Sequence, residues 1–159
     1  MKTVLSFGKR IKRFFPVFCF LCAGPFFLAA QSTAAEIETL LASDALTYAQ
    51  ASRFVLEAAE VAAFPDPTEA FRFAMEKKWL PKKAAPDAAA RLDGISLLFM
   101  QSFGLRGGIL YTLTKAPHYA YREMEYRNFI QGRISPALKV SGENLLFMTS
   151  RVLAYSEEN

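Results

Sequence analysis

The residues of this chain that can hold a ligand are cations placed close to helix-like segments. Arg91 and Lys139 can offer N–H donors to a carboxylate or a phosphate, and Arg53 can add positive charge near other grooves. Arg91 is also close in sequence to Asp87 and Asp93, so a local ion pair at a helix start is the alternative interpretation. The pattern predicts either an anion-binding site or a structural salt bridge.

Aromatic side chains accompany these cations. Trp79, the single tryptophan, can stack on a sugar ring, although its match to Phe129 also fits a core residue packed between two units. Tyr48 and Tyr119 are further candidate contacts, and Tyr119 belongs to a segment rich in tyrosine and basic residues. Such a mixture suits an anionic glycan, and it suits an acidic protein partner equally well.

The chain offers little for catalysis. His118 is its only histidine, which excludes a metal site built from several histidines and argues against a histidine-based nucleophile triad. The glycine-rich segment 104–108 lacks the Lys-Ser/Thr ending of a phosphate-binding loop. We therefore predict no catalytic residue, no metal, no cofactor and no enzymatic activity.

A repeat with a period near 50 residues must position these side chains. The tetrapeptide LLFM occurs at 97–100 and again at 145–148, which is 48 residues later. Upstream landmarks repeat at a spacing of 50: Ala70 with Ala120, and Trp79-Leu80 with Phe129-Ile130. Repeats of this length are stacked units that cannot each bury an apolar face alone. The sequence therefore predicts a repeat protein.

The spacing of apolar residues and the stop signals predict five helices. They cover about residues 46–63, 68–79, 86–103, 118–130 and 141–155. Thr47 and Gln50 fit a capping box at the first helix start, and Pro81 ends the second helix. The stretch 109–113 is too short to establish a strand. The predicted fold class is an all-α, five-helix repeat bundle that alternates long and short helices.

Residues 1–35 have the layout of a secretory signal, with a basic start, an apolar run from Val17 to Ala30 and small residues after it. The run has 14 residues, whereas a membrane-spanning helix needs about 20. We therefore predict cleavage, with membrane attachment only if the signal stays uncleaved. Cleavage after Ala30 and after Ala35 both fit, and Ala35 is preferred. The mature protein is expected in the periplasm or cell envelope.

Removal of the signal changes the charge of the chain. The whole sequence has 19 Lys and Arg against 15 Asp and Glu, but five of the basic residues lie in the first 13 positions. The remaining balance of 14 against 15 removes the basic footprint that nucleic-acid binding needs. Both cysteines, Cys19 and Cys22, also lie in the signal. Residues 36–159 are thus predicted to form a single domain without a disulfide.

The predicted units resemble S-layer homology (SLH) repeats. His118-Tyr119-Ala120 is similar to the opening His-Trp-Ala of that family, and Phe129-Ile130-Gln131-Gly132 is similar to its hydrophobic-to-Gly turn. Ala90-Arg91-Leu92-Asp93 resembles the Thr-Arg-Ala-Glu signature at the start of the long helix, and Thr47-Tyr48-Ala49-Gln50 is a weaker copy. The resemblance implies about two and a half units, over residues 42–64 (partial), 66–105 and 117–155.

In that family, three units commonly form one body, and signature arginines help to bind anionic wall polysaccharide. Only Arg91 keeps the arginine, since Tyr48 replaces it in the first unit and Lys139 in the last. The resemblance implies an exported, non-enzymatic envelope module that binds peptidoglycan or an associated anionic wall polysaccharide. The alternative is a periplasmic helical scaffold that binds a protein partner. Self-association is a further way to complete the missing half unit.

Overall fold

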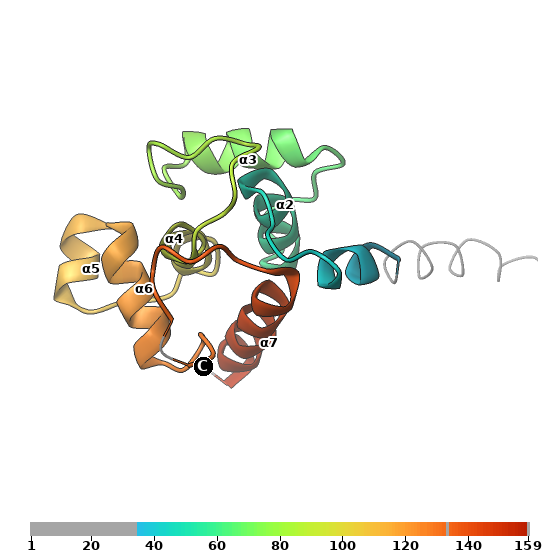
Figure 1. Ribbon diagram of the computed structural model, residues 1–159. Coiled ribbons are helices and arrows are strands. Elements are labelled where there is room, and N and C mark those ends of the chain that lie inside the picture. The colour runs from blue at the N-terminus through green and yellow to red at the C-terminus, as the bar shows by residue number, and fades with distance from the viewer. Residues whose placement is uncertain (1–34, 133, 159) are drawn as a thin grey trace, which may run out of the picture. The chain divides into compact units, whose positions relative to one another are not determined.

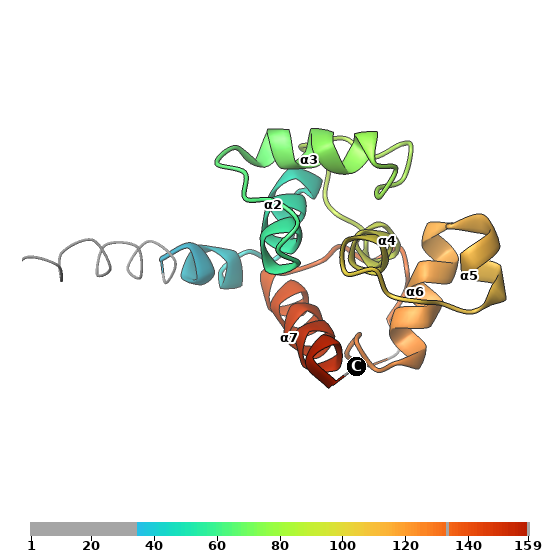
Figure 2. The same ribbon diagram turned by 180° about the vertical axis from the view of Figure 1, so that it is seen from behind.

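The computed structural model describes residues 35–132 and 134–158, so residues 1–34 of the predicted signal lie outside it. The described residues are all-α (Figures 1 and 2). Residues 36–159 form one compact unit, and its buried hydrophobic residues extend from Leu46 to Val152. This unit therefore has a core of its own. Among the described helices, none is long and apolar enough to cross a membrane.

Seven helices are present in the described residues, where the sequence predicts five. A short helix covers 35–41, and the others are α2 (Tyr48–Ala58), α3 (Pro67–Glu76), α4 (Leu92–Ser102), α5 (Ile109–Thr114), α6 (Pro117–Tyr126) and α7 (Gly142–Glu158). The predicted alternation of long and short helices is wrong. Helices α2, α3, α4 and α6 have 10 or 11 residues each, and α7 has 17. The stretch 109–113, to which the sequence patterns assigned no element, lies in α5.

Helices α3 and α6 are closely matched, as the spacing of 50 predicts. Each has ten residues and begins with a proline, Pro67 or Pro117, whose missing N–H is not needed in the first turn. Ala70 and Ala120 are both fully buried. Such small residues let α3 approach α2 closely and α6 approach α4, and both views show these two packed pairs (Figures 1 and 2).

The ends of these two helices explain the second landmark. Lys78 and Asn128 adopt the left-handed conformation, with φ of 61° and 57°. The next residue then turns back on the helix, so Trp79 N–H donates to Ala74 O and Phe129 N–H donates to Met124 O, each at 2.9 Å. The apolar residue after the left-handed position packs against the core, which is why an aromatic stands there in both segments.

Three loops meet in the core and are joined by a closed cycle of backbone hydrogen bonds. Leu46 N–H donates to Val140 O at 2.9 Å, Val140 N–H donates to Ala90 O at 2.9 Å, and Ala90 N–H donates to Leu46 O at 2.8 Å. All three residues are buried. We call this cycle the central ring. Helices α2, α4 and α7 each begin two residues after one of its members, at Tyr48, Leu92 and Gly142.

Hydrogen bonds from the start of α2 explain why α4 begins at Leu92 and not near Pro86. The carbonyls of Pro86 and Ala88 accept hydrogen bonds from Ala49 N–H at 3.1 Å and Tyr48 N–H at 3.0 Å. Those carbonyls would be directed along the axis of α4 if the helix began earlier. Tertiary hydrogen bonds to α2 therefore replace the first predicted turns of the helix.

The ring corrects the alignment of the two LLFM tetrapeptides. Ala90 and Val140 occupy equivalent ring positions 50 residues apart, so Leu98 corresponds to Met148, and both are buried. The tetrapeptides are 48 residues apart and are out of this register by two. Accordingly, residues 97–100 are all buried, whereas Leu146 and Phe147 are only half-buried. The tetrapeptide marks two apolar helices but not equivalent positions in them.

Tyr111 anchors α5 and provides a test of the fold at high pH. Its ring is buried, and its hydroxyl is hydrogen-bonded to the side chain of Gln101. Burial raises the pKa of the Tyr111 phenol from 10.0 to about 12, and the bond to Gln101 only partly opposes this.

We predict that the folded protein loses stability as the pH rises from about 10 to about 12, because the unfolded chain releases this proton first. The loss from Tyr111 should be about 2 kcal/mol, and it should be absent below the pKa of the unfolded state. Urea unfolding at several pH values would measure it. The variant Tyr111→Phe should have a flatter stability profile over this interval. An unchanged slope in the variant would contradict the assignment.

Candidate functional site

Arg91 and Lys139 lie side by side although they are far apart in the sequence. They form an isolated antiparallel bridge, flanked by hydrogen bonds from Leu92 N–H to Leu138 O and from Val140 N–H to Ala90 O, both 2.9 Å. In such a non-hydrogen-bonded pair the Cα atoms are about 4.5 Å apart and the side chains leave on the same face. Both side chains are exposed. Two predicted site residues are thus brought together by the central ring.

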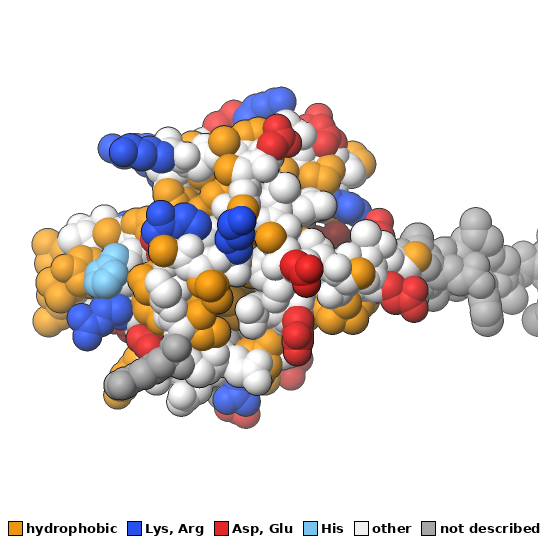
Figure 3. All heavy atoms as spheres, viewed as in Figure 1, with side chains coloured by type: hydrophobic (Ala, Val, Ile, Leu, Met, Phe, Trp, Pro, Cys, Tyr) orange, Lys and Arg blue, Asp and Glu red, His pale blue; other side chains and the backbone are white. Residues whose placement is uncertain are grey.

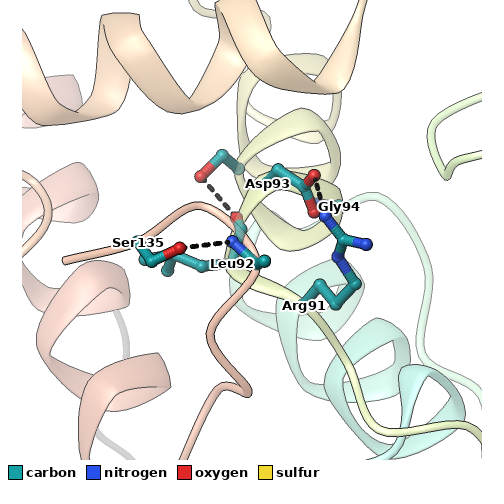
Figure 4. Close-up of polar contacts among 7 residues, drawn as sticks. Arg91, Leu92, Asp93, Gly94 and Ser135 are labelled. Carbon is teal, nitrogen blue, oxygen red and sulfur yellow. Dashed lines mark hydrogen bonds and ion pairs between the residues drawn. The ribbon is translucent and has the colours of Figure 1, made fainter.

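Arg91 also pairs with an acid on its own helix. Its Nη2 lies 2.9 Å from Oδ2 of Asp93, and Asp93 Oδ1 accepts a hydrogen bond from Gly94 N–H at 2.8 Å. Figure 4 shows the guanidinium turned toward Asp93 at the start of α4, with Ser135 on the other side of Leu92. The side chain of Arg91 is 52% exposed and that of Asp93 17%. The predicted ion pair with Asp93 is therefore present, and part of the guanidinium still faces solvent.

Tyr48 lies under this pair. Its side chain is buried, and burial raises the pKa of its phenol. A hydrogen bond with the Arg91 backbone lowers that pKa, the negative charge of Asp93 raises it, and the positive charge of Arg91 lowers it. A Cβ atom on Gly94 would lie 2.6 Å from Tyr48 Oη and 3.1 Å from Pro81 Cγ. Gly94 therefore leaves the space that the tyrosine ring occupies.

The cluster of Tyr48, Arg91, Asp93 and Lys139 carries a net positive charge. Asp93 offsets the charge of Arg91, whereas Lys139 has no ion-pair partner within residues 35–132 and 134–158. In the view of Figure 3, basic side chains gather near the middle of the visible surface, over α4. We call these four residues the basic cluster. It can attract a carboxylate or a phosphate, because two cations that share a face add their fields at a point between them.

The other three predicted site residues have contacts elsewhere. Arg53 pairs with Glu36 at 3.2 Å, and its Nε donates to Phe64 O at 3.0 Å, so it joins the helix 35–41 to the end of the α2–α3 loop. Trp79 is half-buried and makes an edge contact with the ring of Phe73 at 5.9 Å, which agrees with the core interpretation.

Tyr119 is also half-buried. Its ring lies 5.5 Å from that of His118, and it packs against the core. His118 is exposed. The described residues contain no group of three or more His, Cys, Asp and Glu side chains that could hold a metal ion.

The central ring shifts the alignment of the helix starts by one residue. Because Leu46, Ala90 and Val140 are equivalent, Arg91 corresponds to Thr47 and Ser141, and not to Tyr48 and Lys139. Thr47 and Ser141 use their hydroxyls as helix caps, accepting from Gln50 N–H and Asn144 N–H, both at 3.2 Å. The predicted capping box of Thr47 and Gln50 is present.

Arg91 stands alone among these three positions. It is the N-cap residue of α4 but makes no side-chain hydrogen bond to the helix start. The sequence alignment placed Tyr48 opposite Arg91. By the central ring, Tyr48 is instead equivalent to Leu92 and Gly142, the first residues of α4 and α7.

Sequence reasoning missed Gly94 and Pro81 as parts of the site. Gly94 was detectable, because a glycine in the first turn of a helix costs about 1 kcal/mol relative to alanine and calls for a local reason. Pro81 was identified only as a helix stop. Its contact with α4 depends on tertiary packing, and no local pattern reports it.

Comparisons with known proteins add no assignment. A scan against protein-family models, a search of curated proteins and a search of solved structures each found no match to this chain.

The phenol of Tyr48 reports the charges of the basic cluster. We predict that Asp93→Asn lowers the pKa of Tyr48, because it removes a negative charge that opposes ionisation. Arg91→Gln should raise the same pKa, because it removes a positive charge. NMR titration of protein with ¹³C-labelled tyrosine would measure both, with Tyr48→Phe to assign the signal. Shifts in the same direction for both variants would contradict this arrangement of charges.

Proposed function

We propose that this chain is an exported, non-enzymatic envelope module with an SLH-like repeat, and that it binds peptidoglycan or an associated anionic wall polysaccharide through the basic cluster. Support comes from the paired segments at a spacing of 50, from the three helix starts joined by the central ring, and from the exposed cations on one face. The same surface chemistry would serve the rival function, a scaffold for an acidic protein partner.

The observation that carries the proposal is an arginine at a position better suited to a small capping residue. Thr47 and Ser141 cap their helices from the equivalent positions, but Arg91 does not cap α4. A residue that cannot cap there costs roughly 1 kcal/mol relative to serine or threonine. The ion pair with Asp93 is exposed and recovers little of this. Local rules are most often broken at functional sites, so this position is the best candidate for ligand contact.

The geometry supports a ligand with carboxylate or phosphate groups. Arg91 has N–H groups left over after its bond to Asp93, and the Lys139 ammonium leaves the same face of the bridge. One anionic group between them can accept from both. Tyr48 is 4% exposed, so it supports the Arg91 backbone and does not offer a face for sugar stacking.

We predict that Arg91→Ser has opposite effects on binding and stability. Binding of the 36–159 chain to purified cell-wall sacculi should weaken by about tenfold, because a charged donor to the polymer is lost. The free energy of unfolding should rise by about 0.5–1 kcal/mol, because serine can cap α4. Lys139→Gln should weaken binding without stabilising the fold. Sedimentation with sacculi and urea unfolding measure the two effects.

Lys83→Gln is the matched control, because Lys83 is an exposed cation outside the cluster. It should leave binding nearly unchanged. Wild-type binding should also decrease with salt, since exposed charges are screened. No sedimentation of the wild-type domain at low salt would refute wall binding and favour the protein-scaffold alternative. Equal binding by wild type and Arg91→Ser would refute the assigned surface.

A further inference from the structure

Helix α5 is an addition to one of the two matched segments. The connection from α2 to α3 covers the eight residues 59–66, whereas the connection from α4 to α6 covers the fourteen residues 103–116. The six additional residues equal the length of α5. In both views α5 lies on the outer side of α6 (Figures 1 and 2). The helix pairs are complete without α5, so its presence calls for another explanation.

A buried side chain and a hydrogen bond at its start fix α5 on the protein. Tyr111 points inward to Gln101, and a Cβ atom on Gly107 would lie 2.4 Å from its ring, so Gly107 makes room for that ring. Gly108 N–H also donates to Glu123 Oε1 at 2.9 Å, which attaches the start of α5 to α6. These contacts determine which face of the helix is turned outward.

The outward face of α5 is apolar, which reverses the usual orientation of an amphipathic helix. Ile109, Leu110 and Leu113 are 79%, 56% and 78% exposed. Their spacing of i, i+1 and i+4 places them on one face. Figure 3 shows hydrophobic side chains gathered at this end of the molecule, over α5. Contiguous exposed apolar groups of this kind mark interaction surfaces.

The stretch of sequence that carries this face has basic residues but no acidic ones. Residues 94–122 contain no Asp or Glu, while Arg106, Lys115 and Arg122 are exposed. Glu123, the first acid after this stretch, accepts the hydrogen bond from Gly108. Two copies of such a face would bring like charges together, which opposes self-association through α5. An anionic surface is the complementary occupant.

We propose that α5 docks this protein on an anionic lipid surface. Ile109, Leu110 and Leu113 would enter the interface between headgroups and acyl chains, and the flanking cations would meet the lipid phosphates. A projecting face without a matching groove suits a bilayer, because a bilayer adapts its shape to the side chains that enter it. The combination of aliphatic residues and surrounding Lys and Arg is the one that holds peripheral segments at membranes.

Flotation with lipid vesicles tests this proposal with the 36–159 chain, which has its own core. Wild-type protein should float with vesicles of phosphatidylcholine and phosphatidylglycerol in equal parts, and not with phosphatidylcholine alone. Substituting Ile109→Ser, Leu110→Ser and Leu113→Ser together should reduce binding by at least about tenfold. The matched control Leu41→Ser with Leu138→Ser removes exposed leucines elsewhere and should bind as wild type does.

A second variant, with Arg106→Gln, Lys115→Gln and Arg122→Gln, should bind weakly even at low salt, because the electrostatic attraction is lost. Circular dichroism and thermal melting should show that all variants are folded. Absence of wild-type binding to the anionic vesicles, or equal binding to both vesicle types, would overturn the proposal. Undiminished binding of the triple serine variant would do so as well.

Discussion

The closed cycle of hydrogen bonds among Leu46, Ala90 and Val140 is the constraint on which the rest of this structure depends. Each residue donates to one partner and accepts from the other, so no member can move without breaking two bonds. All three are buried, and a buried peptide group without a partner costs about 1–3 kcal/mol. The cycle thus fixes three loops that are 44 and 50 residues apart in the chain, and it fixes the helices that begin after them.

The basic cluster is a direct product of that cycle. Arg91 and Lys139 face each other because their neighbours Ala90 and Val140 are joined in the ring. Tyr48 fills the space beneath Arg91 because α2 begins at the same ring. The proposed ligand surface therefore stands on backbone that the ring holds in place, which fixes where the two charged side chains begin. The apolar face of α5 is different, because it is carried by an insertion that Tyr111 attaches to the core.

Sequence patterns predicted the features that depend on neighbouring residues. Pro67 and Pro117 begin matched helices, Thr47 and Gln50 form their capping box, and Ala70 and Ala120 are buried at equivalent places. These depend on local sterics and hydrogen bonding within a few residues, which a single sequence contains.

Features that depend on distant partners were not predicted. The start of α4 lies six residues later than expected at residue 86, because the carbonyls of the preceding loop bond to α2. Helix α5 escaped notice because it has only six residues, and a run this short with β-branched and aromatic residues does not distinguish a helix from a strand. The arrangement of the candidate site was predicted only in part. Arg91 and Lys139 were singled out, but their contact arises from a bridge between residues that are 48 positions apart. The predicted alignment of the three helix starts differs by one residue from the alignment that the central ring defines.

Native-state hydrogen exchange at the ring amides tests the central role of this cycle most directly. If the ring holds the three loops together, the amide protons of Leu46, Ala90 and Val140 should exchange only through global unfolding. Their protection would then give one shared free energy, equal to the free energy of unfolding obtained with denaturant. Exchange at any one of them more than about tenfold faster than at the other two would show that a loop opens independently, and it would contradict the account.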